Sequence, residues 1–355
     1  MSIPIAQLAD DAIALLRQLI ETQSFSREEA GTADLLEAFL RRHGIAPRRA
    51  GNNVWAVSQN WDETKPTLLL NSHHDTVKPG PSWTYPPLVA TLEGDRLTGL
   101  GSNDAGASAV SLLAVFRHFY DQPTAFNLIC AITAEEEVSG ASGVRSILPE
   151  LGKIDLGIVG EPTGMHAAVA EKGLLVLDGV ARGRTGHAAR NEGDNALYKA
   201  LDDIAWLRSY QFPRVSELLG PVKLTVTQIS AGTQHNVVPD ECRYVVDVRP
   251  TECYSNEEIL ATIRAHVQAE ITARSMHLQS SGLPLGHPLV RKAVAMGKTT
   301  YGSPTLSDQA LMRFPTLKLG PGDSARSHAP DEYILLSEIR AGIADYIALL
   351  TGFEF

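Results

Sequence analysis

Residues 67–75 read Thr-Leu-Leu-Leu-Asn-Ser-His-His-Asp, an apolar run that ends in side chains able to bind protons or metal ions. Thr67–Leu70 has the composition of a strand that is buried on both faces. Similar runs occur at Asn127–Thr133 and Leu156–Val159, and Ala105–Phe119, rich in Ala, Ser, Val and Leu, is predicted to be a buried helix. Strands that alternate with helices predict an α/β domain with a mostly parallel central sheet and flanking helices.

The apolar pattern changes after about Ala167. Three segments now alternate apolar and polar residues, which is typical of an antiparallel sheet with one covered face: Leu174–Ala181, Lys223–Gln228 and Arg243–Val248. Two helices are predicted among them, at Asn195–Arg208 and Asn256–Arg274. After Pro284 a helix, a strand and a last helix restore the first pattern. We therefore predict one domain formed by residues 1–166 and 278–355, interrupted by an inserted α+β domain of residues 167–277.

Polar side chains follow the predicted strands at the point where each strand ends. Because the carboxyl ends of parallel strands meet at one edge of a sheet, these side chains are expected to converge. Asp104, at the start of the predicted buried helix, can join them. Imidazole and carboxylate donors without cysteine suit Zn²⁺ or a similar divalent ion in a hydrolytic site. The converging residues are His73, His74, Asp75, Glu135, Glu136, Glu137, Glu161 and His328.

Single members of this set also fit ordinary roles. A lone histidine or an acidic triplet is common on a solvated surface, and a carboxylate at a helix start can simply interact with the helix dipole. The placement of all of them after strands is what favours a metal site.

Five motifs, in this order, resemble those of the M20-type metallopeptidases, a two-zinc family that includes acetylornithine deacetylase, succinyl-diaminopimelate desuccinylase and carboxypeptidase G. They are SHHD at 72–75 for His-x-Asp, GLGSND at 99–104 for Gly-x-Gly-x-x-Asp, EEE at 135–137 for acid-Glu-Glu, GEPT at 160–163 for Gly-Glu-Pro-Thr, and His328 for the late histidine. The resemblance covers nearly the whole chain. Three strings are similar to a short-chain acetylornithine deacetylase subgroup typical of arginine biosynthesis: NSHHDTV at 71–77, GSNDAG at 101–106 and AEKG at 170–173.

The resemblance implies a centre of two divalent metal ions, with Zn²⁺ expected and Co²⁺ as an alternative. Asp104 would bridge the two ions. His73 and Glu161 would complete one site, and Glu137 and His328 would complete the other.

Two neighbouring acids would support the chemistry. Asp75 would bond the far nitrogen of His73 and fix its tautomer. Two-residue spacing along an extended segment places Asp75 on the side of His73 and turns His74 away, so His74 is not expected to be a ligand. Glu136 would be the general base, and its neighbour Glu135 is given no catalytic role. The run of three glutamates allows this assignment to shift by one position.

The inserted domain is expected to complete the site. His187, in GRTGHA at 183–188, resembles the family histidine that reaches the active site of the other subunit, which implies a homodimer formed through the inserted domain. Asn236 and Arg249 resemble substrate-contacting residues, and the planar guanidinium of Arg249 suits the α-carboxylate of a substrate. Each of the three also fits an exposed side chain satisfied by solvent.

The function implied is removal of an Nα-acyl group, acetyl or succinyl, from ornithine or a relative such as citrulline or lysine, in arginine biosynthesis. A dipeptidase or a deacylase of another N-acyl amino acid is the alternative. A non-catalytic metal-binding relative is disfavoured because such a protein should have lost Glu136 or Asp104. A serine or cysteine hydrolase is disfavoured because the sequence has no nucleophile elbow and no Cys/His pairing in context.

Composition limits the partners and the location. The formal charge of −10 argues against nucleic acid or an anionic membrane as a partner. No apolar run approaches the roughly 20 residues that a membrane-spanning helix needs. Three cysteines without close spacing fit free thiols in a reducing compartment, so we expect a cytoplasmic enzyme with a small-molecule substrate.

Overall fold

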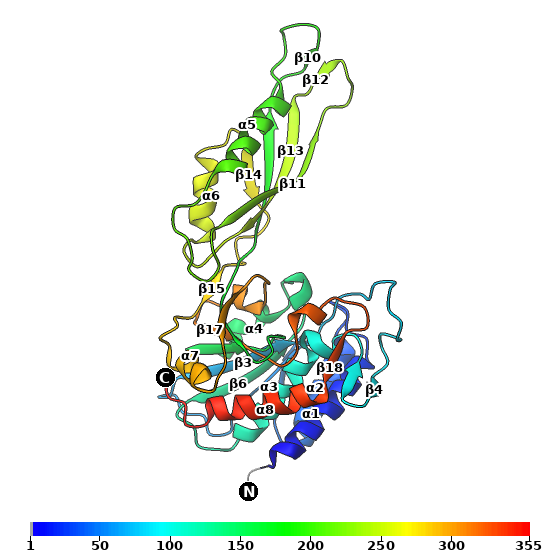
Figure 1. Ribbon diagram of the computed structural model, residues 1–355, viewed down its shortest axis with the longest axis vertical. Helices are drawn as coiled ribbons and strands as arrows, with labels where there is room; N and C mark the ends of the chain where they lie inside the picture. The colour runs from blue at the N-terminus through cyan, green and yellow to red at the C-terminus, as the bar shows by residue number, and fades with distance from the viewer. Residues whose placement is uncertain (1–2) are drawn as a thin grey trace. The chain divides into compact units, whose positions relative to one another are not determined.

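The computed structural model describes residues 3–355, which form two compact units (Figure 1). Unit 2 comprises Ala170–Gly282 and Gly302–Leu306, and unit 1 comprises the rest of the described chain. Unit 2 begins and ends later than the expected inserted domain of residues 167–277. Strand β8 (Ala167–Glu171) begins at the expected boundary and continues through the observed one, so the chain enters unit 2 within a strand.

Unit 1 is built on a sheet with the strand order β1-β2-β6-β3-β7-β17-β8. The central strands β6, β3, β7 and β17 are parallel to one another, whereas β1, β2 and β8 are antiparallel to their neighbours. The mostly parallel sheet predicted from the sequence is therefore confirmed. The bounds are β1 (Arg48–Ala50), β2 (Asn53–Val57), β3 (Thr67–His73), β6 (Asn127–Thr133), β7 (Leu156–Val159) and β17 (Thr316–Lys318). Two short strands pair with β8: β16 (Thr300–Ser303), and β15 (Ser281–Gly282), which pairs with the end of β8 that belongs to unit 2.

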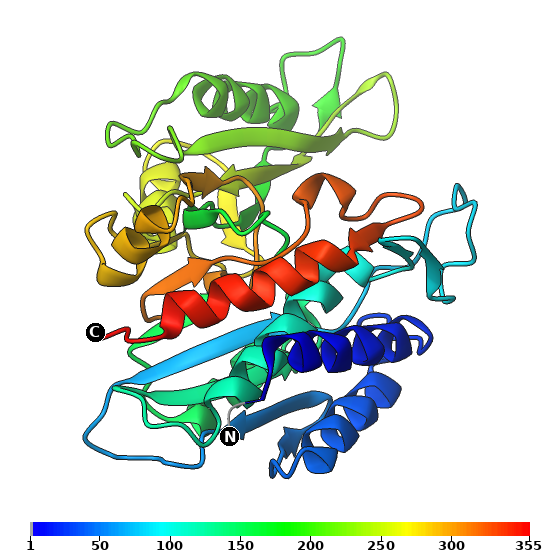
Figure 2. The same ribbon diagram turned by 60° about the horizontal axis from the view of Figure 1, so that its bottom comes forward.

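Helices cover both faces of this sheet. Helices α1, α3 and α8 pack against one another on one face, as Figure 2 shows for α1 in blue and α8 in red, and α4 packs on the other face. Since side chains alternate along β3, Leu68 and Leu70 join the first core and Leu69 joins the second, which explains the uninterrupted apolar run. The helices are α1 (Ile5–Ile20), α2 (Ala30–Arg42), α3 (Ala107–Phe119), α4 (Val144–Leu151), α7 (Pro288–Ala295) and α8 (Leu336–Leu350).

A small antiparallel sheet, not expected from the sequence, lies elsewhere in unit 1. It has the order β18-β5-β4, formed by Tyr333–Leu335, Arg96–Thr98 and Thr91–Glu93. The sheet brings the chain before β18 next to the segment that leads from β5 to Asp104, as the hydrogen bond from the Gly99 amide to the Glu332 carbonyl (3.0 Å) shows.

Unit 2 contains a four-stranded antiparallel sheet with the order β11-β13-β9-β14, and helices α5 and α6 pack on it (Figure 1). A two-stranded ribbon, β10-β12, extends from the same unit. The bounds are β9 (Leu175–Arg182), β10 (Gly186–His187), α5 (Ala196–Ser209), β11 (Lys223–Ala231), β12 (Val237–Val238), β13 (Glu241–Arg249), α6 (Asn256–Arg264) and β14 (Glu270–Ala273).

The predicted helix Asn256–Arg274 is wrong beyond Arg264, where the chain turns into β14. The carboxylate of Asp203 on α5 accepts hydrogen bonds from the amides of Gln268 (2.8 Å) and Ala269 (2.9 Å). These contacts satisfy amides that a continued helix would have bonded to its own carbonyls, and the sequence gives no local sign of them. Within residues 3–355, no helix is long and apolar enough to cross a membrane.

Candidate metal centre

The predicted metal ligands lie at the carboxyl ends of the parallel strands of unit 1. His73 is the last residue of β3, which is longer than the predicted strand Thr67–Leu70. Glu136 and Glu137 begin the turn η2 (Glu136–Val138) after β6, and Glu161 follows β7. His328 lies beyond β17 and the short turn η4 (Ser324–Arg326).

The residue before Glu161, Gly160, lies at the closely packed end of β7. A Cβ at Gly160 would come within 2.8 Å of the Leu112 side chain and 3.0 Å of that of Ser108, both on α3. Only glycine lets the strand end approach the helix this closely. The strand end next to Glu161 is therefore packed directly against α3.

Asp104 lies between the two histidines. Its Oδ1 is 3.3 Å from Nε2 of His73, and its Oδ2 is 3.6 Å from Nε2 of His328. The Glu161 carboxylate approaches the same His73 nitrogen at 3.8 Å, and the Glu137 carboxylate approaches the same His328 nitrogen at 2.9 Å. The structure thus brings together all five residues that the resemblance named as ligands.

Glu136 and Glu137 occupy different positions around Asp104. An oxygen of Glu137 forms, with atoms of His73 and Asp104, a group whose members all lie within 4.8 Å of one another. Glu136 comes no closer than 3.8 Å to Nε2 of His73, and its neighbour Glu135 directs its carboxylate to the amide of Ser142 at 3.2 Å. The two neighbouring glutamates can therefore serve different purposes.

Asp75 contacts both the histidine and the acidic turn. Its Oδ1 is 3.4 Å from Nδ1 of His73, whose nearer partner is the Asp75 carbonyl at 3.0 Å. The Asp75 carboxylate also accepts hydrogen bonds from the amides of Glu136 (3.0 Å) and Glu137 (3.2 Å) and from the hydroxyl of Ser26 (2.7 Å). One buried carboxylate therefore positions the imidazole and the backbone that carries both glutamates.

His74 turns away from this cluster. Its ring nitrogens bond to the hydroxyl of Thr32 (2.8 Å) and the carbonyl of Asn52 (2.9 Å). Both nitrogens are thereby occupied within the protein.

The cluster holds more negative charge than its own side chains can balance. Burial raises the pKa of Glu136 well above its usual value, and the nearby carboxylates of Glu161, Asp308 and Glu137 raise it further against the opposing effect of His73. Burial alone would lower the pKa of His73, but the surrounding carboxylates, Glu136 foremost, outweigh it and raise that pKa. The Glu137 carboxylate raises the pKa of His328 to about 9.

These residues fit divalent metal ions. Nε2 of His73 is buried, has no hydrogen-bond partner and faces three carboxylates. Two ligand atoms that are each about 2.1 Å from a tetrahedral ion lie about 3.4 Å apart. The 3.3 Å and 3.6 Å separations between Asp104 and the two histidines match this value.

Two residues that the sequence analysis did not single out also contact the centre's framework. Asp308 is buried and accepts a hydrogen bond from the hydroxyl of Thr133 (2.8 Å), at the end of β6. Glu332 is buried, and its carboxylate accepts hydrogen bonds from the amides of Gly101, Asn103 and Asp104. Neither belongs to one of the five motifs, so the strand-end pattern could not reveal them.

In unit 2, His187 ends strand β10, and Asn236 lies in the turn directly before β12. His187 is paired with Val237, and the amide of Ala188 donates to the carbonyl of Asn236 at 2.9 Å. Nδ1 of the exposed His187 accepts a hydrogen bond from the amide of Ala189 at 3.1 Å. In the neutral ring this leaves Nε2–H as a free donor.

Arg249 lies at the other end of unit 2. It is the last residue of β13, whose first residue, Glu241, is near β12. The eight residue steps between them span about 26 Å. Its guanidinium is bonded to both carboxylate oxygens of Asp247, at 2.8 Å and 3.1 Å. The structure therefore does not bring Arg249 together with His187 and Asn236 within one chain.

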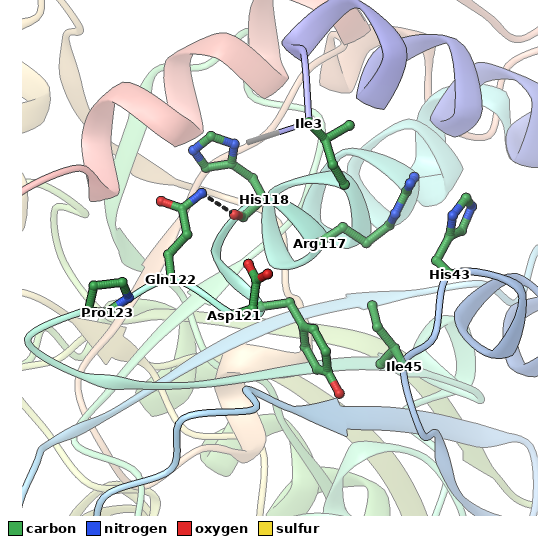
Figure 3. Close-up of a pocket in the computed structure, with 9 residues that line it drawn as sticks. Ile3, His43, Ile45, Arg117, His118, Asp121, Gln122 and Pro123 are labelled. Carbon is green, nitrogen blue, oxygen red and sulfur yellow. Dashed lines mark hydrogen bonds between the residues drawn. The ribbon is translucent and has the colours of Figure 1, made fainter. Parts of the chain in front are cut away.

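A pocket at the far end of α3 is a different kind of surface (Figure 3). Residues from the N-terminal segment, the end of α2 and the end of α3 line it, with Asp121 as the one acidic side chain among them. Helix α3 begins three residues after Asp104 and is 13 residues long, so the pocket lies about 20 Å from the cluster. It therefore has no part in the metal centre.

Comparisons with known proteins identify the family of this chain. The family model described as "Peptidase family M20/M25/M40" matches residues 69–351. A succinyl-diaminopimelate desuccinylase of Dinoroseobacter shibae is 30% identical over 75% of this chain and 74% of its own length. Succinyl-diaminopimelate desuccinylase 2 of a Ruegeria species is 26% identical over 96% of this chain and 94% of its own.

Two solved structures share the fold. The aminopeptidase PepT from Bacillus cereus has a TM-score of 0.77 at 18% identity and covers 96% of this chain and 98% of its own. The Bacillus subtilis YXEP protein, titled a dinuclear metal-binding peptidase, has a TM-score of 0.71 at 16% identity, over 97% of this chain and 98% of its own. The chain therefore belongs to peptidase family M20 and is a hydrolase that acts on amide bonds.

Proposed function

We propose that this protein is a two-metal amidohydrolase that removes the Nα-acyl group, acetyl or succinyl, from ornithine or a close relative such as citrulline. The observation that carries the proposal is the position of Asp104, whose two carboxylate oxygens face His73 on one side and His328 on the other. A carboxylate placed in this way can join two metal sites, each completed by one histidine and one glutamate.

The chemistry follows from the charges around Asp104. Two divalent ions, with Zn²⁺ favoured by the donor set and Co²⁺ as a substitute, would lower the pKa of water toward neutrality and polarise the acyl carbonyl. His73 and Glu161 would hold one ion, and Glu137 and His328 the other. Glu136 would take the proton of the attacking water and deliver it to the leaving amine.

Arg249 would bind the α-carboxylate of the substrate. Its guanidinium already forms a two-pronged contact with the Asp247 carboxylate, which shows that it can present both donors to such a group. A substrate carboxylate would compete with Asp247 for the same donors.

The motif strings at 71–77, 101–106 and 170–173 favour ornithine or citrulline as the carrier of the acyl group, and hence a role in arginine biosynthesis in the cytoplasm. A second candidate, hydrolysis of succinyl-diaminopimelate, is favoured by the names of the curated relatives. Both substrates carry a free α-carboxylate and an acylated amine, so one centre could serve either.

A substrate panel tests the proposal. Purified metal-loaded enzyme is assayed with N-acetylornithine, N-acetylcitrulline, N-succinylornithine, N-succinyl-diaminopimelate and an unmodified dipeptide. We expect the highest kcat/KM for an ornithine or citrulline derivative. Preference for succinyl-diaminopimelate would establish the second candidate instead. If none of the acylated amino acids is hydrolysed, the proposal is wrong.

We also propose that the active enzyme is a homodimer joined through unit 2. Strand β11 is an edge of the sheet in unit 2, with Ile229 exposed on it, and the adjacent helix α5 exposes Tyr198 and Leu201. An unpaired edge beside exposed apolar side chains is a surface that a second copy can cover. The opposite positions of His187 and Arg249 support this arrangement, because a small substrate cannot contact both ends of β13 in one chain. His187 of one subunit would donate through Nε2–H to the acyl oxygen of the substrate in the other subunit's site, where negative charge develops.

Complementation tests this sharing. A His187→Ala subunit and a Glu136→Gln subunit should each be nearly inactive alone. After random exchange, half of the dimers are mixed and each mixed dimer has one intact site, so about a quarter of wild-type activity is expected.

A matched control uses a chain with both substitutions, mixed in equal amounts with wild type. If His187 acts across the dimer, mixed dimers have no intact site and only about a quarter of the activity of an all-wild-type sample remains. If His187 acts within its own chain, about half remains, and the first mixture gains nothing. That second pair of results, with mixed dimers shown by mass spectrometry, would refute the shared site.

A further inference from the structure

The backbone around Asp104 departs from regular helical geometry, although the Gly106 amide still donates to the Gly101 carbonyl (3.0 Å). Gly101 is left-handed (φ 72°), Asp104 has φ −114° and ψ 100°, and Ala105 has φ −117° and ψ 32°, so the segment Ser102–Gly106 is an irregular turn before α3. Buried amides in such a turn need acceptors from elsewhere in the protein. Most of those acceptors belong to one residue, Glu332.

Glu332 is buried (3% exposed) and lies directly before β18. Its Oε1 accepts hydrogen bonds from the amides of Asn103 and Asp104, both at 2.8 Å, and its Oε2 accepts one from the amide of Gly101 at 3.0 Å. Its carbonyl accepts a fourth, from the amide of Gly99 at 3.0 Å. One side chain therefore fixes the backbone on which the Asp104 carboxylate is mounted.

The same segment also carries His328, four residues before Glu332. A second connection joins the two segments through Asn103, whose side chain donates to the carbonyl of Asp323 (3.1 Å) and accepts from the Asp323 amide (3.0 Å). Asp104 and His328 are therefore held relative to each other by bonds between their own backbone segments. The 3.6 Å separation between Asp104 Oδ2 and His328 Nε2 depends on these bonds.

We infer that Glu332 is a positioning residue for the metal centre: by holding the Gly101–Asp104 amides, it places the Asp104 carboxylate between the two metal sites and so sets metal affinity. This inference rests on the proposed two-metal function. Glu332 touches no predicted ligand atom, and it acts through the Asp104 backbone. Glutamine cannot replace it. The NH2 group of a glutamine side chain is a donor, and it would face backbone N–H groups that are also donors.

The test compares Glu332→Gln with Asp331→Asn. Asp331 is the adjacent residue and makes the same kind of contact, because its carboxylate accepts from the amides of Thr84 (2.8 Å) and Tyr85 (3.0 Å), but that loop holds no metal ligand. Zinc affinity is measured by competition with a chromophoric chelator, and the absorption spectrum of the Co²⁺-loaded protein reports ligand geometry. Loss of such an outer contact typically weakens metal binding about 10–100-fold.

We expect Glu332→Gln to weaken zinc binding by this amount and to alter the Co²⁺ spectrum, with kcat partly restored by excess metal. Asp331→Asn should leave zinc affinity and spectrum at wild-type values. If Glu332→Gln does not fold, Glu332→Asp, which is one methylene too short to reach all three amides, should weaken binding in the same direction.

Wild-type zinc affinity and spectrum in folded Glu332 variants, with only a lower Tm, would overturn the inference and leave the proposed function intact. Failure of the wild-type protein to bind metal would overturn the proposed function itself.

Discussion

Removal of bound metal is expected to abolish amide hydrolysis, and added Zn²⁺ or Co²⁺ is expected to restore it. The physical reason is the concentration of carboxylates around His73, among them Asp104, Glu136 and Glu161. Without cations these carboxylates repel one another, and the raised pKa values of Glu136 and His73 favour the protonated forms of these two groups. Burial is the largest influence on both. It raises the pKa of Glu136, which neighbouring carboxylates raise further, whereas its lowering effect on the pKa of His73 is outweighed by those carboxylates. Metal ions would replace those protons.

The measurement is hydrolysis of an N-acyl amino acid before chelation, after chelation and after metal return, with metal content followed by elemental analysis. Circular dichroism of the chelated sample separates loss of metal from loss of fold. Undiminished hydrolysis in a sample that contains no metal would exclude a metal-dependent mechanism.

Glu136→Gln is expected to lower kcat by about 10²–10⁴-fold while leaving metal content close to that of wild type. A glutamine cannot accept the proton of the attacking water. The substitution should not release metal, because it is an oxygen of Glu137 that lies within 4.8 Å of the ligand atoms of His73 and Asp104 in the metal-compatible group, and Glu137 also lies 2.9 Å from Nε2 of His328.

The neighbouring glutamates supply matched controls for this prediction. Glu137→Gln should lose metal, and Glu135→Gln should change neither metal content nor kcat, since its side chain can still accept from the Ser142 amide. Loss of metal in Glu136→Gln together with full metal content in Glu137→Gln would show that the assignment of the two roles is shifted by one residue.

Local patterns were enough to predict the parallel sheet and the convergence of side chains at its edge. In β3, all residues from Thr67 to His73 are buried, and consecutive leucines enter two different cores. An apolar run without alternation is the direct signature of that arrangement. Since the parallel strands fix one edge, His73 and Glu161 had to meet even though they are far apart in the chain.

Contacts between distant segments could not be predicted in the same way. The carboxylate of Asp203, on helix α5, accepts a hydrogen bond from the Ala269 amide beyond the end of α6. The carboxylate of Glu332 accepts one from the Gly101 amide, 231 residues earlier in the chain. Neither contact leaves a periodic or compositional trace, because a single acidic residue in a polar segment is indistinguishable from an exposed one. The distance between Arg249 and His187 likewise depends on β13, which runs without interruption from Glu241 to Arg249. The sequence alone did not show how far apart this strand places them.

The positions of bound metal test the central claim most directly. Crystals of the zinc-loaded protein, measured on both sides of the zinc absorption edge, should give two anomalous peaks about 3.5–4 Å apart. One peak should contact His73 and Glu161, the other Glu137 and His328, and both should contact the Asp104 carboxylate. Zinc bound away from Asp104, or a single peak that leaves one of the two histidines without metal, would contradict a two-metal centre bridged by this residue.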